Sequence, residues 1–151
     1  MPITSTLMGL GAYPGSGDNW LGMLGMHGTY EANMAMHDCD LMLCIGARFD
    51  DRITGKIDEF SPKSKKIHVD IDATSINKNV EVDLSIIADC GKFLNEVLKI
   101  MENRNNKFQS YDLWWKQIDS WKKVNCLQYK ANSDVIMPQY AIQRLYELTK
   151  N

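Results

Sequence analysis

The sequence contains one unbroken apolar run that is closed by a glycine, Leu41-Met42-Leu43-Cys44-Ile45-Gly46, and a charged turn follows it, Ala47-Arg48-Phe49-Asp50-Asp51-Arg52. Five consecutive apolar residues that end in glycine are typical of a strand buried on both faces of a parallel sheet. The run therefore predicts a buried parallel strand, and the charged turn is the loop that leaves its carboxyl end.

The residues before this strand predict a further strand, two glycine-rich loops and a short helix. Residues 4–8 look like the end of a strand, and the loop 9–15 follows at once. The second glycine-rich stretch covers residues 21–28. Thr29 can then cap a helix that runs to about His37. A domain that opens this way is expected to lack its first strand and helix.

Two more strands and a helix are predicted after the charged turn. Residues 66–72 form a strand with acidic residues at its carboxyl end, and residues 84–88 form a short buried strand. Asp89 can cap a helix over residues 91–103, whose apolar residues recur at helical spacing. This alternation of strands and helices predicts an α/β fold with a Rossmann-like parallel sheet and flanking helices.

The remaining residues predict a helical C-terminal extension. Residues 103–110 are polar and indicate a linker, and Ser110 can cap the helix after it. One side of that helix carries Trp114, Ile118, Trp121 and Val124. Side chains at this spacing form a packing face far more often than a ligand site. After a second break at residues 129–136, Pro138 fits the first turn of a last helix.

Composition places the chain among folded globular proteins. It has 151 residues, 44% of them hydrophobic, and its 17 basic and 19 acidic side chains leave a net charge of −2. Neither a nucleic acid nor an anionic membrane is therefore an expected partner. No apolar run is long enough to span a bilayer, and no signal peptide is evident. The four cysteines form no Cys-x-x-Cys pair, which favours a reduced intracellular protein.

The predicted loops bring residue types that suit nucleotide binding to one edge of the sheet. Ligands of parallel sheets bind beyond the carboxyl ends of the strands. Glycines there let the backbone approach a phosphate, Arg48 can neutralise it, and Asp70 or Asp89 can bind a sugar hydroxyl. The same residues also suit plain turns and helix caps. The glycine patterns match no dinucleotide fingerprint, so both interpretations stay open at this point.

Several stretches, in this order and spacing, resemble the catalytic subunit of the acetohydroxyacid synthase (acetolactate synthase) family. They are Thr6-Leu7-Met8-Gly9-Leu10-Gly11-Ala12-Tyr13-Pro14-Gly15, Leu21-Gly22-Met23-Leu24-Gly25-Met26-His27-Gly28, Gly46-Ala47-Arg48-Phe49-Asp50-Asp51-Arg52-Ile53-Thr54-Gly55-Lys56, and His68-Val69-Asp70-Ile71-Asp72 with Ile76-Asn77-Lys78-Asn79. The resemblance covers residues 2–100. Residues 138–148 are similar to the opening of that family's third domain.

The resemblance implies an enzyme that uses thiamine diphosphate and Mg²⁺. Such an enzyme decarboxylates pyruvate and transfers the two-carbon unit to a second 2-ketoacid, in valine, leucine and isoleucine biosynthesis. Residues 1–103 would be the central FAD-binding domain (the DHS-like NAD/FAD-binding fold) without its first strand. Residues 104–134 would be a linker with a helix, and residues 135–151 the first helix of the C-terminal thiamine-diphosphate-binding domain. The FAD of this family has a structural and not a redox role.

Site residues follow from the resemblance, position by position. The FAD contacts would be Thr6, Leu7, Leu24, Gly25, Met26, His27, Gly46, Ala47, Arg48, Phe49, Asp50, Asp70, Asp89 and Cys90. Asp51 and Arg52 would line the substrate and inhibitor channel, where the Arg52 guanidinium suits a ketoacid carboxylate. The family's catalytic glutamate and its Mg²⁺ motif have no counterpart here, so catalytic and metal residues are expected elsewhere and the chain alone is expected to be inactive.

Further expectations concern stability, assembly and location. Loss of the central first strand would expose sheet edges and apolar faces, so the isolated chain is expected to be marginally stable or to aggregate. The parent enzyme would be a homodimer or tetramer, with or without a small regulatory subunit, in a bacterial cytoplasm. Two other hypotheses remain. One is a stand-alone, non-catalytic nucleotide-binding module or decayed gene product, and the other is a different thiamine-dependent decarboxylase or oxidase.

Overall fold

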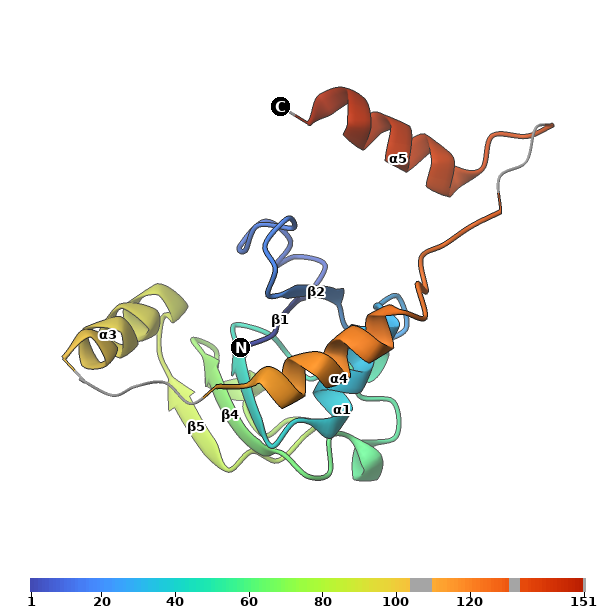
Figure 1. The fold of residues 1–151 in the computed structure, drawn as a ribbon. Coiled ribbons are helices and arrows are strands. Elements are labelled where there is room, and N and C mark those ends of the chain that lie inside the picture. Colours follow the sequence, from blue (N-terminus) through green and yellow to red (C-terminus); the bar gives the residue numbers. More distant parts are fainter. Residues whose placement is uncertain (104–109, 131–133, 151) are drawn as a thin grey trace.

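Two small parallel sheets and the helices around them make up the protein, as a computed structural model shows (Figure 1). The structure describes residues 1–103, 110–130 and 134–150. Its strands and helices are β1 (Ile3–Ser5), β2 (Trp20–Met23), α1 (Tyr30–Asp38), β3 (Leu41–Ile45), α2 (Asp51–Thr54), β4 (Lys65–Asp70), β5 (Leu84–Ile87), α3 (Cys90–Glu102), α4 (Asp112–Lys122) and α5 (Pro138–Thr149). Short 3₁₀ turns cover Ile57–Glu59 and Ala73–Ser75.

The strands are all parallel, but they do not form one continuous sheet. β1 pairs with β2, and β4 lies between β3 and β5. The register of the larger sheet sets Ile45 opposite Val69, and Asp70 opposite Ile87. The carboxyl ends of β3, β4 and β5 therefore lie along the same edge, as the sequence predicts for a parallel α/β fold.

Local capping explains where the predicted helices begin. The Thr29 hydroxyl accepts a hydrogen bond from Ala32 N–H at 3.2 Å, and Asp89 accepts one from Lys92 N–H at 2.9 Å. Such caps satisfy donors that the first turn of a helix leaves unpaired. The helices predicted after Thr29, Asp89 and Pro138 are all confirmed, with ends within two residues of those expected.

The first core joins the smaller sheet to two helices. Leu21 of β2, Ala32 and Ala35 of α1, and Ile118 and Trp121 of α4 are buried together. The small side chains of α1 allow α4 to lie across it (Figure 1). The packing face predicted for residues 114–124 is therefore confirmed, except that Val124 is 50% exposed.

The second core lies beside the larger sheet. Phe49 packs edge-to-face on Phe60, with their ring centres 5.6 Å apart, and Val80 closes the cluster. Met42 and Cys44 of β3 contact it from the sheet side. This core fixes the segment that leaves the carboxyl end of β3, because the ring of Phe49 is anchored in it.

Several predictions about the strands are wrong. The segment 20–23 is a strand (β2), although its glycine suggested a loop. The predicted burial of β3 and β5 also fails, since Leu41, Leu43, Leu84 and Ile87 are 38–66% exposed. Both strands are edges of a three-stranded sheet, so neighbours that would cover them are missing among the described residues.

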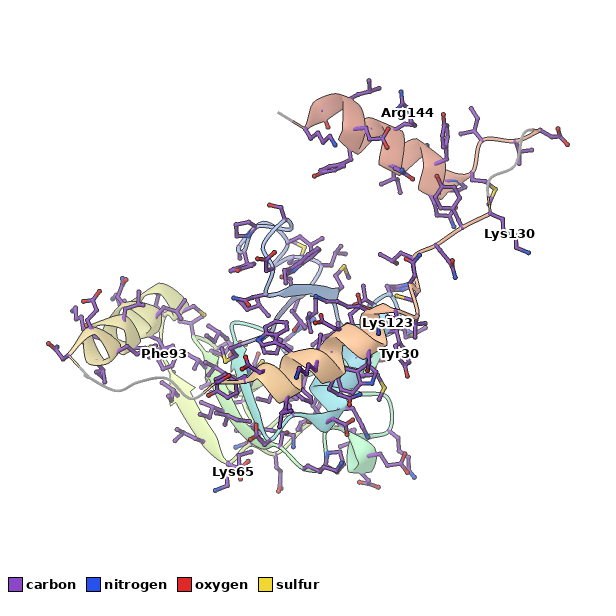
Figure 2. The ribbon with its side chains drawn as sticks, in the orientation of Figure 1. Tyr30, Lys65, Phe93, Lys123, Lys130 and Arg144 are labelled. Carbon is purple, nitrogen blue, oxygen red and sulfur yellow. The ribbon has the colours of Figure 1, made fainter. Side chains whose placement is uncertain are left out.

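The C-terminal elements carry exposed apolar side chains. α3 buries no residue, and Leu94, Leu98 and Met101 are all more than 40% exposed. α5 stands away from the sheets, and the Arg144 side chain projects away from them (Figure 2). Tyr129 Oη, in the segment before α5, donates to Gln143 Oε1 at 2.9 Å. The predicted linker at residues 103–110 falls largely outside the described residues, as does part of the break predicted at 129–136.

Replacement of Ile118 by alanine is expected to lower the free energy of unfolding by about 2–5 kcal/mol, because it leaves a cavity between α1 and α4. Urea denaturation measures this change. The matched control is Leu113→Ala on the same helix, where the side chain is 81% exposed and the expected change is within about 0.5 kcal/mol. Equal effects of the two replacements would contradict the packing described for α4.

Candidate functional site

The predicted cofactor residues all lie at or just beyond the carboxyl ends of strands. Thr6 and Leu7 follow β1, residues 24–27 follow β2, and residues 46–50 follow β3. Asp70 is the last residue of β4, and Asp89 with Cys90 follows β5 at the start of α3. This is the edge at which open α/β sheets bind their ligands.

A close backbone contact joins the loop after β2 to α2, the short helix that follows the segment 46–50. Met26 N–H donates to the Arg52 carbonyl oxygen at 3.0 Å, and Arg52 Nη1 lies 3.6 Å from Met26 Sδ. Gly25 has a φ of +84°, and a Cβ at this position would collide with the same Arg52 carbonyl. Only glycine allows both the left-handed backbone and this approach. The structure therefore brings Leu24–His27 and Asp51–Arg52 together.

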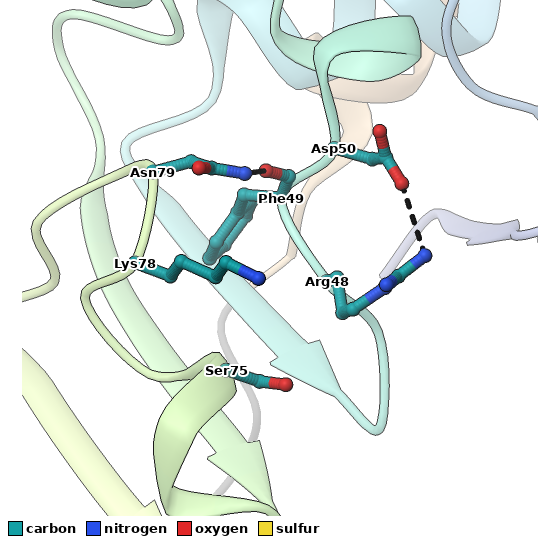
Figure 3. A pocket seen from close by; sticks show the side chains of 6 residues that line it. All are labelled: Arg48, Phe49, Asp50, Ser75, Lys78 and Asn79. Atoms are coloured by element: carbon teal, nitrogen blue, oxygen red, sulfur yellow. Dashed lines mark hydrogen bonds and ion pairs between the residues drawn. The ribbon is translucent and has the colours of Figure 1, made fainter.

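The segment 46–50 is held by contacts from three directions. Cys44 Sγ donates to Ala47 O at 2.9 Å, and the Phe49 ring is buried against Phe60 and His68. From the other side, Asn79 Nδ2 donates to the Phe49 carbonyl at 2.6 Å (Figure 3). The backbone of this segment is thus fixed on both sides of Arg48.

A polar cavity of about 140 Å³ lies between this segment and the turn after β4 (Figure 3). Its lining residues are Arg48, Phe49, Asp50, Ser75, Lys78 and Asn79. Ser75, Lys78 and Asn79 were not predicted as site residues. A signal for the last two existed, because the stretch 76–79 already belongs to the motifs quoted above.

The carboxylates of Asp70 and Asp89 already take part in turns and caps. Asp70 is 9% exposed, and its Oδ1 accepts a hydrogen bond from Asp72 N–H at 2.9 Å. Its Oδ2 lies 3.8 Å from Nε2 of the buried His68. Asp89 caps α3, where a Cβ on Gly46 would come within 2.8 Å of Cys90 Sγ. Both carboxylates therefore take part in local turn and capping hydrogen bonds at the strand ends.

Thr6 and Leu7 stand apart from the other predicted contacts. The Thr6 hydroxyl accepts from Gly9 N–H at 3.0 Å within its own turn, and Leu7 is 66% exposed. Among the residues that the structure describes, no hydrogen bond connects this turn to the segment 46–50. The turn at Thr6 follows a strand of the smaller sheet, whereas the segment 46–50 follows a strand of the larger one.

Two titratable groups of the segment 44–50 have shifted pKa values. Burial raises the pKa of the Cys44 thiol to about 12, against an ordinary value of 9.0, although its bond to Ala47 opposes the shift. Hydrogen bonds with Asp51, and to a smaller extent the Arg48 guanidinium 3.1 Å away, lower the pKa of the exposed Asp50. Cys44 is therefore a neutral donor, and Asp50 is an ionised acceptor.

Within the described ranges, no group of three or more His, Cys, Asp or Glu side chains is arranged to hold a metal ion. None of the helices described is both long enough and apolar enough to cross a membrane. All four cysteines are free thiols.

Alanine at position 25 is expected to push the loop after β2 away from Arg52 and to destabilise the fold by about 2 kcal/mol or more. Gly11→Ala is the matched control, because Gly11 also has a positive φ (+95°) but has open space around it. Hydrogen exchange of the Met26 amide measures the displacement. An amide that stays equally protected in both variants would count against the contact.

The Cys44 thiol predicts a loss of stability at alkaline pH. Unfolded Cys44 loses its proton near pH 9, whereas the folded chain keeps it to about pH 12, so the free energy of unfolding falls as pH rises through this interval. Urea unfolding from pH 8 upward should show a smaller fall in Cys44→Ala than in the wild type. Cys126→Ala, which removes an exposed thiol, should keep the wild-type fall. If stability fell with pH to the same extent in the wild type, Cys44→Ala and Cys126→Ala, the raised pKa of Cys44 would be refuted.

Comparison with known proteins places this sequence in a family. Residues 1–97 match the family model for the central domain of thiamine pyrophosphate enzymes. The chain is 48% identical to the acetolactate synthase large subunit of Haemophilus influenzae over 151 residues, and these are 99% of this chain and 26% of that protein.

Other relatives show similar sequence identity and coverage. Acetolactate synthase isozyme 3 large subunit of Escherichia coli is 43% identical, over 99% of this chain and 26% of its own length. Acetolactate synthase 1, chloroplastic, of Zea mays is 46% identical, over 99% of this chain and 24% of its own. The chain thus spans about a quarter of the length of the curated relatives it matches. Since the family model covers well over half of the chain, the chain belongs to the thiamine pyrophosphate enzyme family and carries its central domain.

Proposed function

We propose that these residues are the central part of an acetolactate synthase large subunit. Such an enzyme decarboxylates pyruvate and joins the two-carbon unit to a second 2-ketoacid, and it uses thiamine diphosphate and Mg²⁺ bound by parts of the enzyme outside this chain. The supporting observation is the contact between Gly25, Met26 and Arg52, because it ties together the two most distinctive motifs of the resemblance. Identities of 43–48% along the whole chain support the same proposal.

Within that enzyme, this segment binds FAD. The chain's residues fit the group, because Gly25, Gly28 and Gly46 pack so closely against Arg52, Met23 and Cys90 that a Cβ would collide there, and these contacts fix the shape of the loops that would receive the FAD. Thr6 and Leu7 would contact FAD beside its flavin side, and residues 24–27 and 46–50 would make the second and third contacts with it. Asp70 would bind sugar hydroxyls, and Asp89 with Cys90 would bind the adenosine end. FAD serves here as a structural requirement.

Asp51 and Arg52 line the substrate channel in this proposal. Among the described residues, no carboxylate lies within ion-pair distance of Arg52, and its guanidinium reaches only the Met26 sulfur. A planar guanidinium can hold a ketoacid carboxylate through two parallel hydrogen bonds. Asp51 is the first residue of α2 and directly precedes Arg52. The backbone contact between Met26 and Arg52 therefore fixes both residues relative to the loop 24–27.

The remaining proposals concern organisation. Residues 1–103 form the FAD-binding unit, residues 104–134 a linker with α4, and residues 135–151 the start of the next domain. The enzyme acts as a homodimer or tetramer in a bacterial cytoplasm, with or without a small regulatory subunit.

The proposal is tested on the native polypeptide purified from its source cells. We expect one FAD per subunit after release by denaturation, and acetolactate formation from pyruvate with thiamine diphosphate and Mg²⁺. A polypeptide of residues 1–151 alone should form none. A native polypeptide that holds FAD without forming acetolactate would instead favour a nucleotide-binding module, and a native polypeptide with neither property would remove both hypotheses.

Arg52→Lys in the native polypeptide is expected to raise the KM for the ketoacid by about tenfold, since a lysine loses the two-bond geometry, with FAD content unchanged. Steady-state kinetics and flavin absorbance measure the two effects. Arg144→Lys makes the same replacement in α5, away from the strand ends, and should leave KM unchanged. A KM that does not respond to Arg52→Lys would exclude Arg52 from the substrate channel.

A further inference from the structure

One asparagine pairs with both backbone groups of the glycine at the centre of the loop after β2. Asn33 Oδ1 accepts a hydrogen bond from Gly25 N–H at 2.8 Å, and Asn33 Nδ2 donates to the Gly25 carbonyl at 3.0 Å. A side-chain amide that pairs in this way replaces the two bonds a neighbouring strand would make. It fixes the peptide planes on both sides of Gly25.

The fixed peptides determine where the next residues lie. Met26 N–H, one residue further along, donates to the Arg52 carbonyl at 3.0 Å. The chain of contacts therefore runs from Asn33 through Gly25 to Met26 and Arg52. It links α1 to both loops that carry the proposed flavin and substrate residues.

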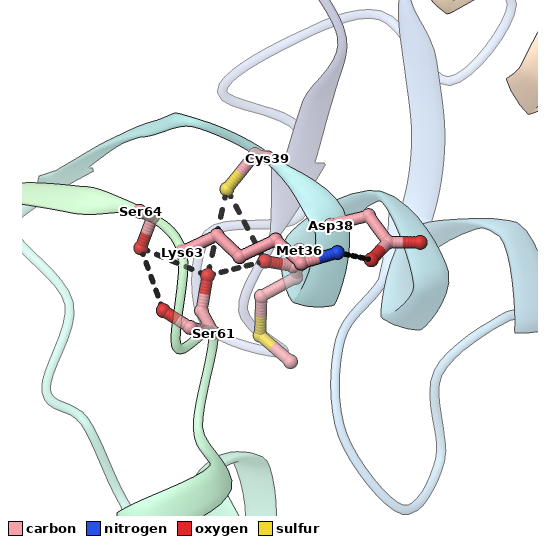
Figure 4. Close-up of polar contacts among 6 residues, drawn as sticks. All are labelled: Met36, Asp38, Cys39, Ser61, Lys63 and Ser64. Atoms are coloured by element: carbon pink, nitrogen blue, oxygen red, sulfur yellow. Dashed lines mark hydrogen bonds and ion pairs between the residues drawn. The ribbon is translucent and has the colours of Figure 1, made fainter.

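Asn33 stands on a helix that is anchored at both ends. At its start, Thr29 Oγ1 donates to Leu21 O at 2.5 Å and also caps the first turn. At its end, Ser61 Oγ donates to the Met36 carbonyl at 2.6 Å, and Lys63 pairs with Asp38 (Figure 4). Between these ends, Ala32 and Ala35 are buried against α4. The half-buried Asn33 side chain therefore projects from a helix whose position is fixed at both ends and along its buried face.

We propose that Asn33 is a positioning residue for the flavin site. It acts through Gly25, holding the Leu24–His27 backbone in the orientation that FAD requires and, through Met26, keeping Arg52 in register. The inference rests on the proposed function, because it assigns a role within that same site. Asn33 itself contacts neither cofactor nor substrate in this proposal.

Two variants of the native polypeptide separate the two hydrogen bonds. Asn33→Ala removes both, whereas Asn33→Asp keeps the acceptor for Gly25 N–H and sets a second oxygen against the Gly25 carbonyl. The control is Asn103→Ala. It removes a bond of the same kind, from Asn103 Nδ2 to the Lys99 carbonyl at 2.8 Å, at the end of α3.

Three readouts are compared: hydrogen exchange of the Gly25 and Met26 amides without FAD, the Kd for FAD, and the urea midpoint of the flavin-free protein. In Asn33→Ala we expect the Gly25 and Met26 amides to exchange faster. The Kd for FAD should rise tenfold or more, which is about the effect of losing one hydrogen-bonded contact. The urea midpoint should stay close to that of Asn103→Ala. Asn33→Asp should keep part of the Gly25 protection and lose FAD affinity. Asn103→Ala should change neither exchange nor Kd.

The two ways of failing are distinguishable. If the wild-type polypeptide binds FAD but Asn33→Ala binds it equally well, the positioning role is wrong and the proposed function stands. The positioning role is also wrong if affinity and urea midpoint fall in parallel, since Asn33 would then be a general stabiliser. If the wild type binds no FAD, the proposed function and this inference are both overturned.

Discussion

The hydrogen bond from Met26 N–H to the Arg52 carbonyl is the constraint on which the arrangement of the site depends. It joins the loop that follows β2 of the smaller sheet to α2, the short helix that comes after β3 of the larger sheet. No ladder hydrogen bond connects the two sheets in the part of the chain that the structure describes. Their relative position therefore rests on this contact and on α1, which packs against β2 and leads directly into β3.

Local chemistry made three of the helices predictable, whereas α2 was not predicted and the N-cap of α4 is Tyr111, not the expected Ser110. Thr29, Asp89 and Pro138 each mark a helix start through their own side chain or ring, so neighbours in sequence are sufficient to place them. β2 was missed for the opposite reason. It is only four residues long and contains Gly22 at a φ of +102°, and its pairing with β1 cannot be inferred from a repeating pattern. The burial of β3 and β5 was wrong because burial depends on neighbouring elements and not on the run itself.

The residues of the candidate site also fall into a group that could be predicted from sequence and a group that could not. The position of Gly46, Arg48 and Asp70 at strand ends could be predicted from sequence, because the topology of parallel sheets puts strand ends together. The supporting asparagines could not. Asn33 and Asn79 bond to backbone eight and thirty positions away, and a lone amide on a helix or in a turn carries no pattern that indicates its partner. Residues that hold the loop backbone in place are thus harder to predict from sequence than residues at the strand ends themselves.

The buried pair of His68 and Phe49 gives this protein an internal reporter. The two rings meet edge-to-face with their centres 5.1 Å apart, and neither ring nitrogen of His68 has a hydrogen-bond partner among the described residues. The carbon-bound protons of the imidazole therefore lie in the ring-current field of the Phe49 ring. Phe49 belongs to the segment after β3, so any shift of that segment alters the resonance frequency of His68. With three histidines in the chain, that resonance can be assigned by substitution, and the site can be followed by NMR without an added label.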